Sequence, residues 1–548
     1  MRIGLALPPL ALFVALALAA PAHGATTFHV NTEVDNNDGS CDPAPGDCSL
    51  REANNASSAG DTIDLPAGTY QLGSELVIDH PLTIAGQGPA STIVTANGDH
   101  RVMLIDGGTQ VLRGLTITGG NADSQSAGGG IYDSTTEPLK LKNARVTNNN
   151  VNFDGATGAT RAGGGGIFSK GPVEVDGGSI DSNHVFLGFD QGVSGSGGGG
   201  IYATGALTLR NTELHNNIMQ VQSSRTNGDP AAADGGGAAY ARGAVTARGT
   251  TIAQNNATVT AGGGTTMKDG GGGIYAKGGN VTITNSTFWN NAANLDVVII
   301  DNGGAGLYSF GGATKLTNVT LNGNSTARGT GGGVYREGGS VTLRNTILAA
   351  NTSAPSTGPG NPDNCAGGVT SAGHNLESAN TCGLKKPGDI KNRNPKLGTL
   401  ASNGGPTRTL ALKKGSPAID AAVKCPATDQ RGVRRPRGRA CDIGAYEANV
   451  PNVKTGAAKK VGSGGATLTG TVNPGGRPTS YVFRYGKTKA YGSTTPATAA
   501  GSGRTNVPAT FHLKGLKPGK TYHYRLVATN SAGTERGADR TFKTAAAS

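Results

Sequence analysis

Glycine-rich strings recur through the middle of this sequence, and each is followed by a short run in which apolar and polar residues alternate. The alternation, as in Leu207 to Leu209 or Val281 to Ile283, has the period of two expected of a strand with one buried face. Each string ends on an aliphatic and an aromatic residue, and this pattern occurs seven times. The aromatic residues are Tyr132, Phe168, Tyr202, Tyr240, Tyr275, Tyr308 and Tyr335. The repetition predicts a fold of equivalent structural units.

A second pattern follows each alternating run. An asparagine or glycine stands three residues before an aliphatic or phenylalanine and six before another asparagine, and this interval is the same in all seven repeats. The first positions are Asn143, Gly177, Asn211, Gly249, Asn285, Asn318 and Asn345. The second positions are Asn149, Asn183, Asn217, Asn255, Asn291, Asn324 and Asn351. Both residue types tolerate the left-handed backbone that tight corners often need.

A fixed block of about twenty residues with short strands and such corners is what one coil of a parallel β-helix requires. Successive coils would stack at roughly 4.8 Å, the spacing between paired strands. Equivalent aliphatic residues would then pile into a core, and the second asparagines could form a ladder of side-chain amides. We therefore predict an all-β chain with a single-stranded parallel β-helix over residues 61–395, which opens with irregular coils near Thr62.

The region of stacked repeats resembles the pectin-lyase-like right-handed β-helix superfamily. Its glycine-rich and asparagine-containing repeats are similar to those of polymorphic outer membrane proteins. The resemblance implies right-handed coils, but it implies little about activity, because one fold serves many functions.

The first residues are typical of a secretory signal peptide. Arg2 precedes an apolar run from Leu5 to Ala20, and small residues follow from Ala22 to Gly24. We expect residues 1–24 to be removed on export, with a retained N-terminal anchor as the alternative. The rest of the sequence has no apolar run long enough for a membrane span, so no span is expected after signal removal.

Residues 25–60 contain Phe28 to Thr32, a cysteine at 41, and Cys48 to Ala53, which reads CSLREA. The segment resembles the CSLREA domain of exported repeat proteins. We expect it to cover the otherwise open first end of the β-helix.

Downstream of the repeats, residues 396–447 and the sequence just before them resemble the choice-of-anchor Q domain, a family found beside surface-attachment signals. The resemblance rests on SAGHNL from Ser371, NGGP from Asn403, GSPAID from Gly415, DQRG from Asp429 and CDIGAYE from Cys441. We expect this segment to cap the C-terminal end of the stack. Its charged residues could form an acid cluster, but we favour ion pairs that hold the cap together. They are Asp420, Asp429, Arg431, Asp442 and Glu447.

From Pro451 the asparagine repeat ends and longer alternating runs begin. They predict a small antiparallel β-sandwich over residues 451–545. The stretch from Leu516 to Tyr522 resembles the fibronectin type III corner, in which the tyrosine hydroxyl folds back onto the backbone. That resemblance implies a spacer or adhesion module.

Six cysteines in an exported chain indicate disulfides rather than free thiols. Fifteen connectivities are formally available. Short loops close at the lowest entropic cost, so we favour the local pairs Cys41 with Cys48, Cys365 with Cys382 and Cys425 with Cys441. A metal site is the alternative, but no histidine lies at zinc-finger spacing.

Composition excludes some classes of function. With 91 glycines and a single tryptophan, the chain is unlike an enzyme of packed helices and sheets. The net charge of +12 is concentrated toward the C-terminal half, including the run from Arg434 to Arg439. An acidic partner or a solvated, wall-facing surface would fit this charge. Nucleic acid is not expected, because aromatic stacking residues are absent there.

Between each second asparagine and the next glycine string lies a segment of variable length. The segments are 150–162, 184–196, 218–234, 256–269, 292–302 and 325–330. Because they occupy one place in the repeat, they should project together as loops and offer a recognition surface, unless they are only tolerated insertions.

Three carboxylates near the ends of these segments, Asp234, Asp269 and Asp301, could line up along the axis. Such a row could bind calcium or could consist of solvated loop ends. No other cofactor and no other metal is expected, and no catalytic residue is identified. The histidines His29, His184, His215 and His374 occupy non-equivalent positions and are read as surface or capping groups.

The sequence favours a secreted or surface-associated bacterial protein, most simply a monomer, that binds polysaccharide or another envelope component through the loops. The alternative is a polysaccharide lyase or glycoside hydrolase. A third reading is a structural spacer of the cell wall.

Overall fold

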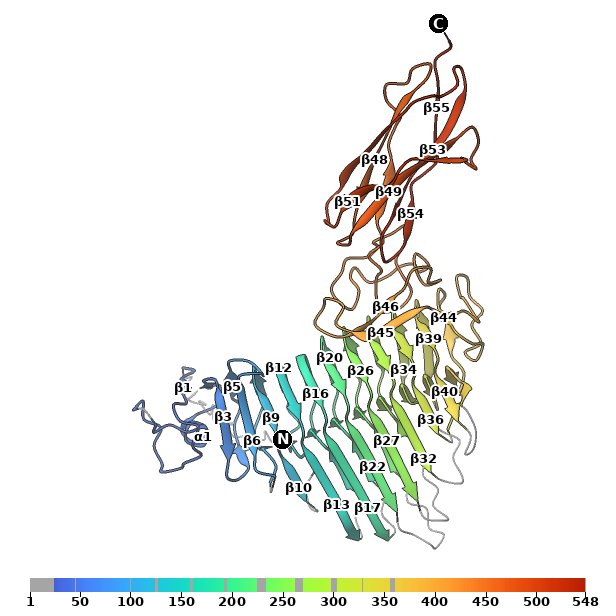
Figure 1. Cartoon of the computed structure of the whole chain (residues 1–548). Coiled ribbons are helices and arrows are strands. Elements are labelled where there is room, and N and C mark those ends of the chain that lie inside the picture. The colour runs from blue at the N-terminus through green and yellow to red at the C-terminus, as the bar shows by residue number, and fades with distance from the viewer. Residues whose placement is uncertain are drawn as a thin grey trace, which may run out of the picture.

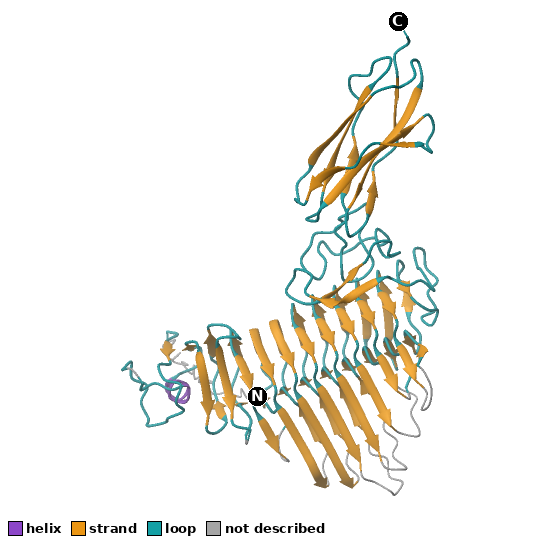
Figure 2. Cartoon of the chain, viewed as in Figure 1, coloured by secondary structure: helices purple, strands orange, loops and turns teal. Residues whose placement is uncertain are grey.

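The computed structural model describes residues 24–547 except 45, 99, 124–126, 158–160, 192–194, 224–232, 262–269, 297–302, 328 and 355–359. Within these ranges the chain is nearly all β, with one helix, α1 (Leu50–Ala56). A long stack of parallel strands is followed by small antiparallel sheets, which confirms the predicted fold class (Figures 1 and 2). The predicted signal peptide lies outside the described residues apart from Gly24.

Each coil of the β-helix supplies three short strands, which pair in parallel with those of the next coil and form three ladders. The strands that follow the glycine strings form the first ladder: β4 (Leu76–Ile78), β7 (Met103–Ile105), β11 (Ile131–Asp133), β15 (Ile167–Ser169), β19 (Ile201–Ala203), β24 (Ala239–Ala241), β29 (Ile274–Lys277), β33 (Leu307–Phe310), β37 (Val334–Arg336) and β42 (Cys365–Ala366).

The second ladder precedes the first corner residue of each coil. It consists of β1 (Thr27–His29), β2 (Thr62–Leu65), β5 (Thr83–Gly86), β8 (Gln110–Arg113), the first parts of β12 (Leu139–Thr147) and β16 (Val173–Asp181), β20 (Leu207–Arg210), β25 (Val245–Arg248), β30 (Val281–Thr284), β34 (Ala313–Thr317), β38 (Ser340–Arg344) and β43 (Thr370–Ser371).

The third ladder lies beyond that corner. It consists of β3 (Gly68–Leu72), β6 (Thr92–Ala96), β9 (Thr116–Thr118), the last parts of β12 and β16, β21 (Glu213–His215), β26 (Thr251–Ala253), β31 (Thr287–Trp289), β35 (Thr320–Asn322), β39 (Ile347–Ala349) and β44 (Leu376–Glu377).

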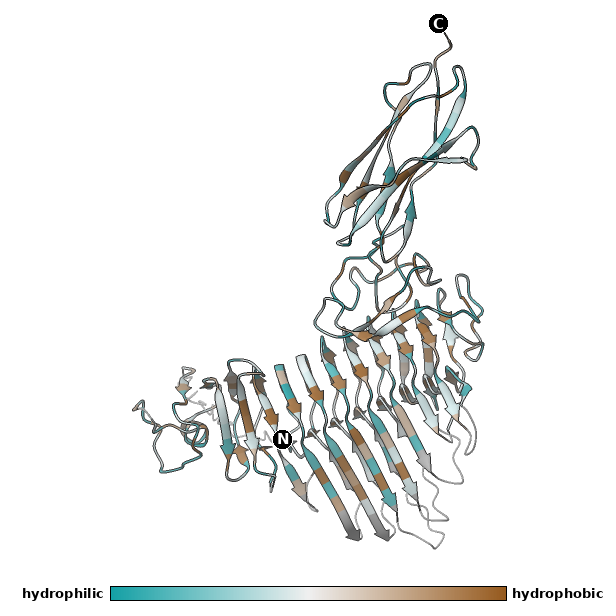
Figure 3. Cartoon of the chain, viewed as in Figure 1, coloured by the Kyte–Doolittle hydropathy of each residue, from teal (hydrophilic) through white to brown (hydrophobic). Residues whose placement is uncertain are grey.

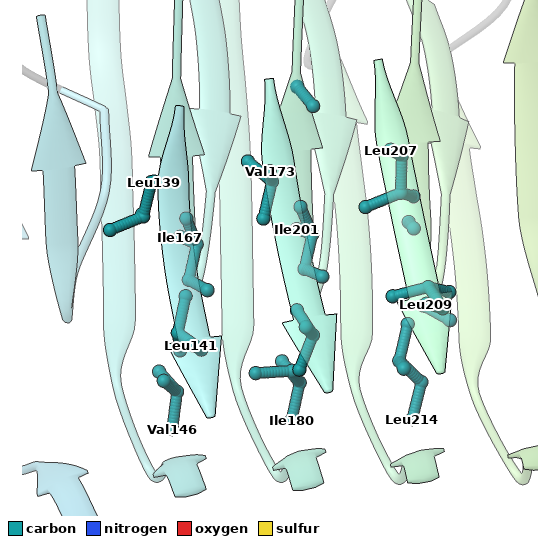
Figure 4. Close-up of a cluster of buried hydrophobic side chains, with 14 of the residues drawn as sticks. Leu139, Leu141, Val146, Ile167, Val173, Ile180, Ile201, Leu207, Leu209 and Leu214 are labelled. Atoms are coloured by element: carbon teal, nitrogen blue, oxygen red, sulfur yellow. The ribbon is translucent and has the colours of Figure 1, made fainter. Parts of the chain in front are cut away.

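Side chains from all three ladders fill the interior of the coils. In register, Leu139, Val173 and Leu207 form one column of this main core, and the neighbouring columns are equally apolar (Figure 4). Figure 3 shows the same alternation as brown bands along successive strands. One coil alone would leave these columns open to water, so stacking is the condition for burial.

The variable segments were expected as loops, and in the structure each of them begins as a strand. Their outgoing parts form a sheet of β10 (Asn121–Asp123), β13 (Asn150–Thr157), β17 (His184–Gln191), β22 (Ile218–Ser223), β27 (Asn256–Ala261), β32 (Ala292–Asp296), β36 (Ser325–Ala327), β40 (Thr352–Ala354) and β41 (Asn361–Pro362). The returning parts are β14 (Arg161–Gly164), β18 (Gly195–Gly198), β23 (Ala233–Gly236) and β28 (Gly270–Gly271). We call these two sheets the fin, and its long strands extend away from the coils in Figure 1.

The fin has its own hydrophobic core, which explains why its segments are strands. Alternate residues of the outgoing strands, such as Val185, Leu187 and Met219, are fully buried. Glycine in the returning strands lets the second sheet approach closely, since a Cβ on Gly197 would lie 2.8 Å from Met219 Cγ. The glycine-rich strings are therefore a packing requirement of the fin as well as corners of the chain.

The N-terminal segment extends the stack. Strand β1 pairs in parallel with β2, and Leu50 and Ala53 of α1 are buried in the main core. The helix begins with a capping box, in which Ser49 and Glu52 each accept a hydrogen bond from the other's backbone N–H.

The segment 396–447 was expected at the end of the stack, and in the structure it lies along the side of the coils. Its ordered strands are β45 (Leu397–Ala401) and β46 (Thr409–Leu412), and the rest is irregular (Figure 1). Thr407 Oγ1 donates to Gly249 O at 2.8 Å, and Ala445 N donates to Thr320 Oγ1 at 3.0 Å. The side position arises because corner amides and third-ladder hydroxyls of several coils face this segment.

The C-terminal module is an antiparallel sandwich. One sheet contains β47 (Asn452–Thr455), β48 (Ala466–Asn473) and β52 (Val507–Leu513). The other contains β49 (Thr479–Gly486), β50 (Ser493–Thr494), β51 (Thr498–Gly501), β53 (Thr521–Thr529), β54 (Thr534–Arg536) and β55 (Arg540–Lys543). Lys517 N donates to Tyr522 Oη at 3.0 Å, which is the predicted tyrosine corner.

Candidate functional surface on the fin

A ladder of buried asparagines separates the main core from the fin core. The side-chain Nδ2 of each asparagine donates to Oδ1 of the asparagine in the next coil, at distances between 2.8 and 3.0 Å from Asn149 to Asn351. The backbone N–H of each residue donates to the same oxygen, as from Asn183 to Asn217. The ladder ends on Asn364, which the repeat pattern did not reveal. With its donors and acceptors used internally, it is a scaffold and not a binding site.

A second ladder is aromatic, and sequence analysis did not anticipate it. The seven rings that end the glycine strings lie one above another, with centroids 4.5 to 5.2 Å apart. They close the fin core, and burial raises the pKa of Tyr202 to about 12, which keeps that phenol neutral. The signal was present in the sequence, because the rings are in equivalent positions of every repeat.

The outer face of the outgoing sheet carries two columns of described side chains. The first contains Asn121, Asn150, His184, Ile218, Asn256, Ala292, Ser325 and Thr352. The second contains Asn152, Phe186, Gln220, Thr258, Asn294, Ala327 and Ala354. We call these two columns the fin face.

The fin face combines amides with a small apolar patch. Ile218 is 40% exposed and Phe186 is half-buried, and both lie next to Gln220. Some amides bind each other, as where Asn294 Nδ2 donates to Asn256 Oδ1 at 3.1 Å. Amides can donate and accept, so the face can satisfy hydroxyl groups of either polarity.

The described side chains of the fin face are also uncharged, while Asp123, in register with Asn152, continues the second column at its N-terminal end. Apart from His184, the two columns of described side chains contain no ionisable group. Burial lowers the pKa of His184 even though a hydrogen bond with Gln220 opposes the shift, so the ring is neutral at pH 7. A neutral surface of amides and apolar patches is suited to polyhydroxylated partners rather than to nucleic acid.

The predicted row of aspartates is described only in part. Asp234 lies in β23 and forms an ion pair with Lys277, while Asp269 and Asp301 fall outside the described residues. Among the residues that the structure describes, no group of His, Cys, Asp and Glu side chains could hold a metal ion. Calcium binding by the row stays a prediction.

Of the charged residues predicted to hold segment 396–447 together, Asp429, Arg431 and Glu447 form buried ion pairs, while the carboxyl groups of Asp420 and Asp442 accept hydrogen bonds from backbone N–H groups. Arg431 contacts Asp429 at 2.6 Å, and Arg435 contacts Glu447 at 2.8 Å. Burial and the neighbouring Glu447 raise the pKa of Asp442 well above its usual value. The carboxylates are thus engaged in holding the segment together.

On the coils, the buried carboxylate of Asp181 in the third ladder pairs with Arg145 at 2.7 Å. Glu213, on the following coil, pairs with Arg408 at 2.7 Å. Since both carboxylates are committed to arginines, neither is free to act as the acid or base of a glycosidase.

The six cysteines form the three local disulfides, Cys41–Cys48, Cys365–Cys382 and Cys425–Cys441. Disulfides persist in oxidising compartments, so they indicate an extracellular protein. None of the helices in the described part of the chain has the length and apolar character needed to cross a membrane.

No protein-family model matches the chain, and no curated protein matches it. Among solved structures, it is similar to the sensor domain of the anti-sigma factor RsgI4 from Pseudobacteroides cellulosolvens, with 20% identity over 18% of this chain and 92% of that one, at a TM-score of 0.15. It is also similar to the cell-surface-expressed chitinase ChiW from Paenibacillus sp. str. FPU-7, with 12% identity over 74% of this chain and 24% of that one, at a TM-score of 0.13. Because these TM-scores are low, neither likeness assigns a function to this chain.

Proposed function

We propose that this chain is a surface-associated bacterial binding protein that recognises polysaccharide, or another envelope component rich in hydroxyl groups, through the fin face. The observation that carries the proposal is the double column of described, uncharged side chains, in which amides lie beside Phe186 and Ile218. The columns repeat at the spacing of the coils, so the face offers side chains at regular intervals to an extended chain. Avidity over several coils would compensate for weak individual contacts.

The ends of the chain fit this role. A CSLREA-like segment at one end, a choice-of-anchor Q-like segment along the side and a fibronectin type III-like spacer would present the fin away from a surface. We propose that the chain acts as a monomer, in which neighbouring coils take the place of multiple subunits.

The test is binding to an immobilised panel of neutral and acidic polysaccharides by the mature chain and by a Phe186→Ala, Gln220→Ala variant. We expect the variant to bind at least about 10-fold more weakly, since it loses the apolar platform and an adjacent amide. The matched control is Thr246→Ala, Thr282→Ala, which alters exposed residues of the second ladder. Equal binding by the fin variant and the control would reject the fin face as the binding surface.

The same panel separates the alternatives. Release of reducing or unsaturated ends would identify the lyase or hydrolase, and retention without product identifies a binder. If the chain is not retained on any polysaccharide and releases no product, the structural spacer is the function that remains.

A further inference from the structure

The first corner of each coil forms a column of residues with left-handed backbone, the left-handed column: Asn143, Gly177, Asn211, Gly249, Asn285, Asn318 and Asn345, with φ between 46° and 75°. Two of its seven members are glycines and leave gaps between the asparagine side chains. Residues 428–432, which belong to segment 396–447, cover the gap at Gly249. The gap forms a pocket of about 270 Å³ whose lining includes Arg210, Asn211, Arg248, Gly249 and Asp429.

The pocket is positively charged. Arg210 and Arg248 are paired in register on β20 and β25, so their guanidinium groups arise from neighbouring strands. Neither has an ion pair or side-chain hydrogen bond with any described residue, and Asp176, next in the same column, is not within ion-pair distance. The Asp429 carboxylate is neutralised by Arg431 at 2.6 Å. Two unpaired arginines therefore face the same space.

An amide in the lining also lacks a partner. Asn211 is exposed, and its side chain forms no hydrogen bond with a described residue. Its Oδ1 borders the gap, since a Cβ on Gly249 would lie 2.5 Å from it. This oxygen accepts hydrogen bonds, so it favours a ligand that carries a donor as well as a negative charge.

We propose that this pocket binds one carboxylated, hydroxylated unit, with the chemistry of a uronic acid. Its carboxylate lies against Arg210 and Arg248, where planar guanidinium groups match a carboxylate. One of its hydroxyl groups donates to Asn211 Oδ1, which borders the gap. The volume is just below the range of about 300–1,000 Å³ typical of small-molecule sites, so it admits a compact unit and not a folded chain. The site is separate from the fin face and does not depend on it.

Isothermal titration of the mature chain with D-glucuronate, D-glucose and sulfate tests this chemistry. We expect heat of binding with glucuronate, none with glucose and weaker binding of sulfate, which lacks the donor. No heat with glucuronate overturns the proposal and leaves a pocket filled by water. Equal affinity for sulfate also overturns it, because the site would then be a plain anion site.

Two kinds of variant locate the binding. Arg248→Ala removes one charged contact and is expected to weaken glucuronate binding on the order of 10- to 100-fold. Gly249→Asn fills the gap with the residue that the column uses in other coils, and it should abolish binding while preserving the fold. The Asn211 Oδ1 atom, 2.5 Å from the added Cβ, lies at the end of a side chain and can rotate away.

Gly177→Asn is the matched control. Gly177 is the other glycine of the left-handed column, and a Cβ added there would lie no closer than 3.6 Å to Asn143, its nearest neighbour. Among the described residues, Glu213 is the most N-terminal residue of the coils that accepts a hydrogen bond from segment 396–447. The segment therefore does not cover the gap at Gly177. Glucuronate binding by Gly177→Asn should equal that of the parent. Loss of binding in this control, or its survival in Gly249→Asn, would refute the location.

Discussion

The two asparagine columns of the β-helix share a residue type and lie a constant six residues apart in the sequence, yet they have different roles. In the ladder from Asn149 to Asn351, the side chains point inward, are buried and bind each other. There the left-handed residue is the one before the asparagine, such as Asn216 before Asn217. In the left-handed column the asparagine itself has positive φ, and its amide faces outward.

The outward amides acquire their role from what covers them. Asn318 Nδ2 donates to Asp442 O at 3.0 Å, and Asn345 Nδ2 donates to Val423 O at 2.8 Å, so these two attach the side segment. Asn211, where the cover is incomplete, lines a pocket instead. The comparison teaches that a backbone corner sets where an amide lies, and its neighbours in space set what the amide does.

The largest expected difference between the columns is in stability. Asn217→Ala removes the acceptor of two donors of Asn183 and the donor to Ile180 O, so it should cost about 3 kcal/mol or more. Asn211→Ala, at the exposed corner, should cost only about 1 to 2 kcal/mol for a left-handed alanine. Chemical denaturation measures both, and equal losses would contradict the distinction.

A smaller effect is expected where the left-handed column holds the side segment. Asn318→Ala removes the Nδ2 that donates to two carbonyls of that segment, Asp442 O and Gly444 O, and should destabilise its attachment by about 2 kcal/mol. Hydrogen exchange should become faster in residues 396–447 and stay unchanged in the fin. Uniform acceleration over the coils would show that the amide supports the β-helix itself.

Charge near the ladder corner gives a pH-dependent prediction. Burial alone would raise the pKa of Asp181, but hydrogen bonds from Arg145, Ser179 and Thr147 outweigh it and lower the pKa. A lowered folded pKa means that the ionised group stabilises the fold above its ordinary value of 3.8 and that this contribution is lost as the pH falls below it. Asp181→Asn should therefore cost about 2 kcal/mol at pH 7 and make stability less dependent on pH below 4. The check is the melting temperature of both proteins as a function of pH. An equally steep fall below pH 4 in the variant and the parent would contradict this prediction.

The smallest change in stability is expected at Gly177, which segment 396–447 does not cover. Gly177→Asn replaces glycine at φ 75° by a residue that tolerates this conformation, and it reduces the freedom of the unfolded chain. A change in stability of less than about 1 kcal/mol is expected from calorimetric melting. A large loss would mean that this corner needs glycine for reasons other than its backbone angle.

Much of the fold could be predicted because its repeat is local. The period-two runs and the invariant spacing of corner residues identified the coils, the tyrosine at 522 identified the sandwich corner, and the favoured cysteine pairs are those of the structure. The strands of the fin were missed, because glycine-rich segments of unequal length suggest loops. Only the packing of Val185 and Met219 against close glycine strands reveals a second core.

The sequence by itself determined the stacking of coils, since identical short-range patterns leave one way to bury every apolar column. Tertiary structure alone decided which corner amides are covered, that residues 428–432 roof the gap at Gly249, and that residues 396–447 lie beside the coils instead of at their end. These contacts join residues more than 140 positions apart, such as Asn285 and Thr428, and no periodic pattern records them. The physical reason is that burial dictates which face of each strand points inward, whereas the docking of one segment on another depends on the shapes and donors that folding first creates.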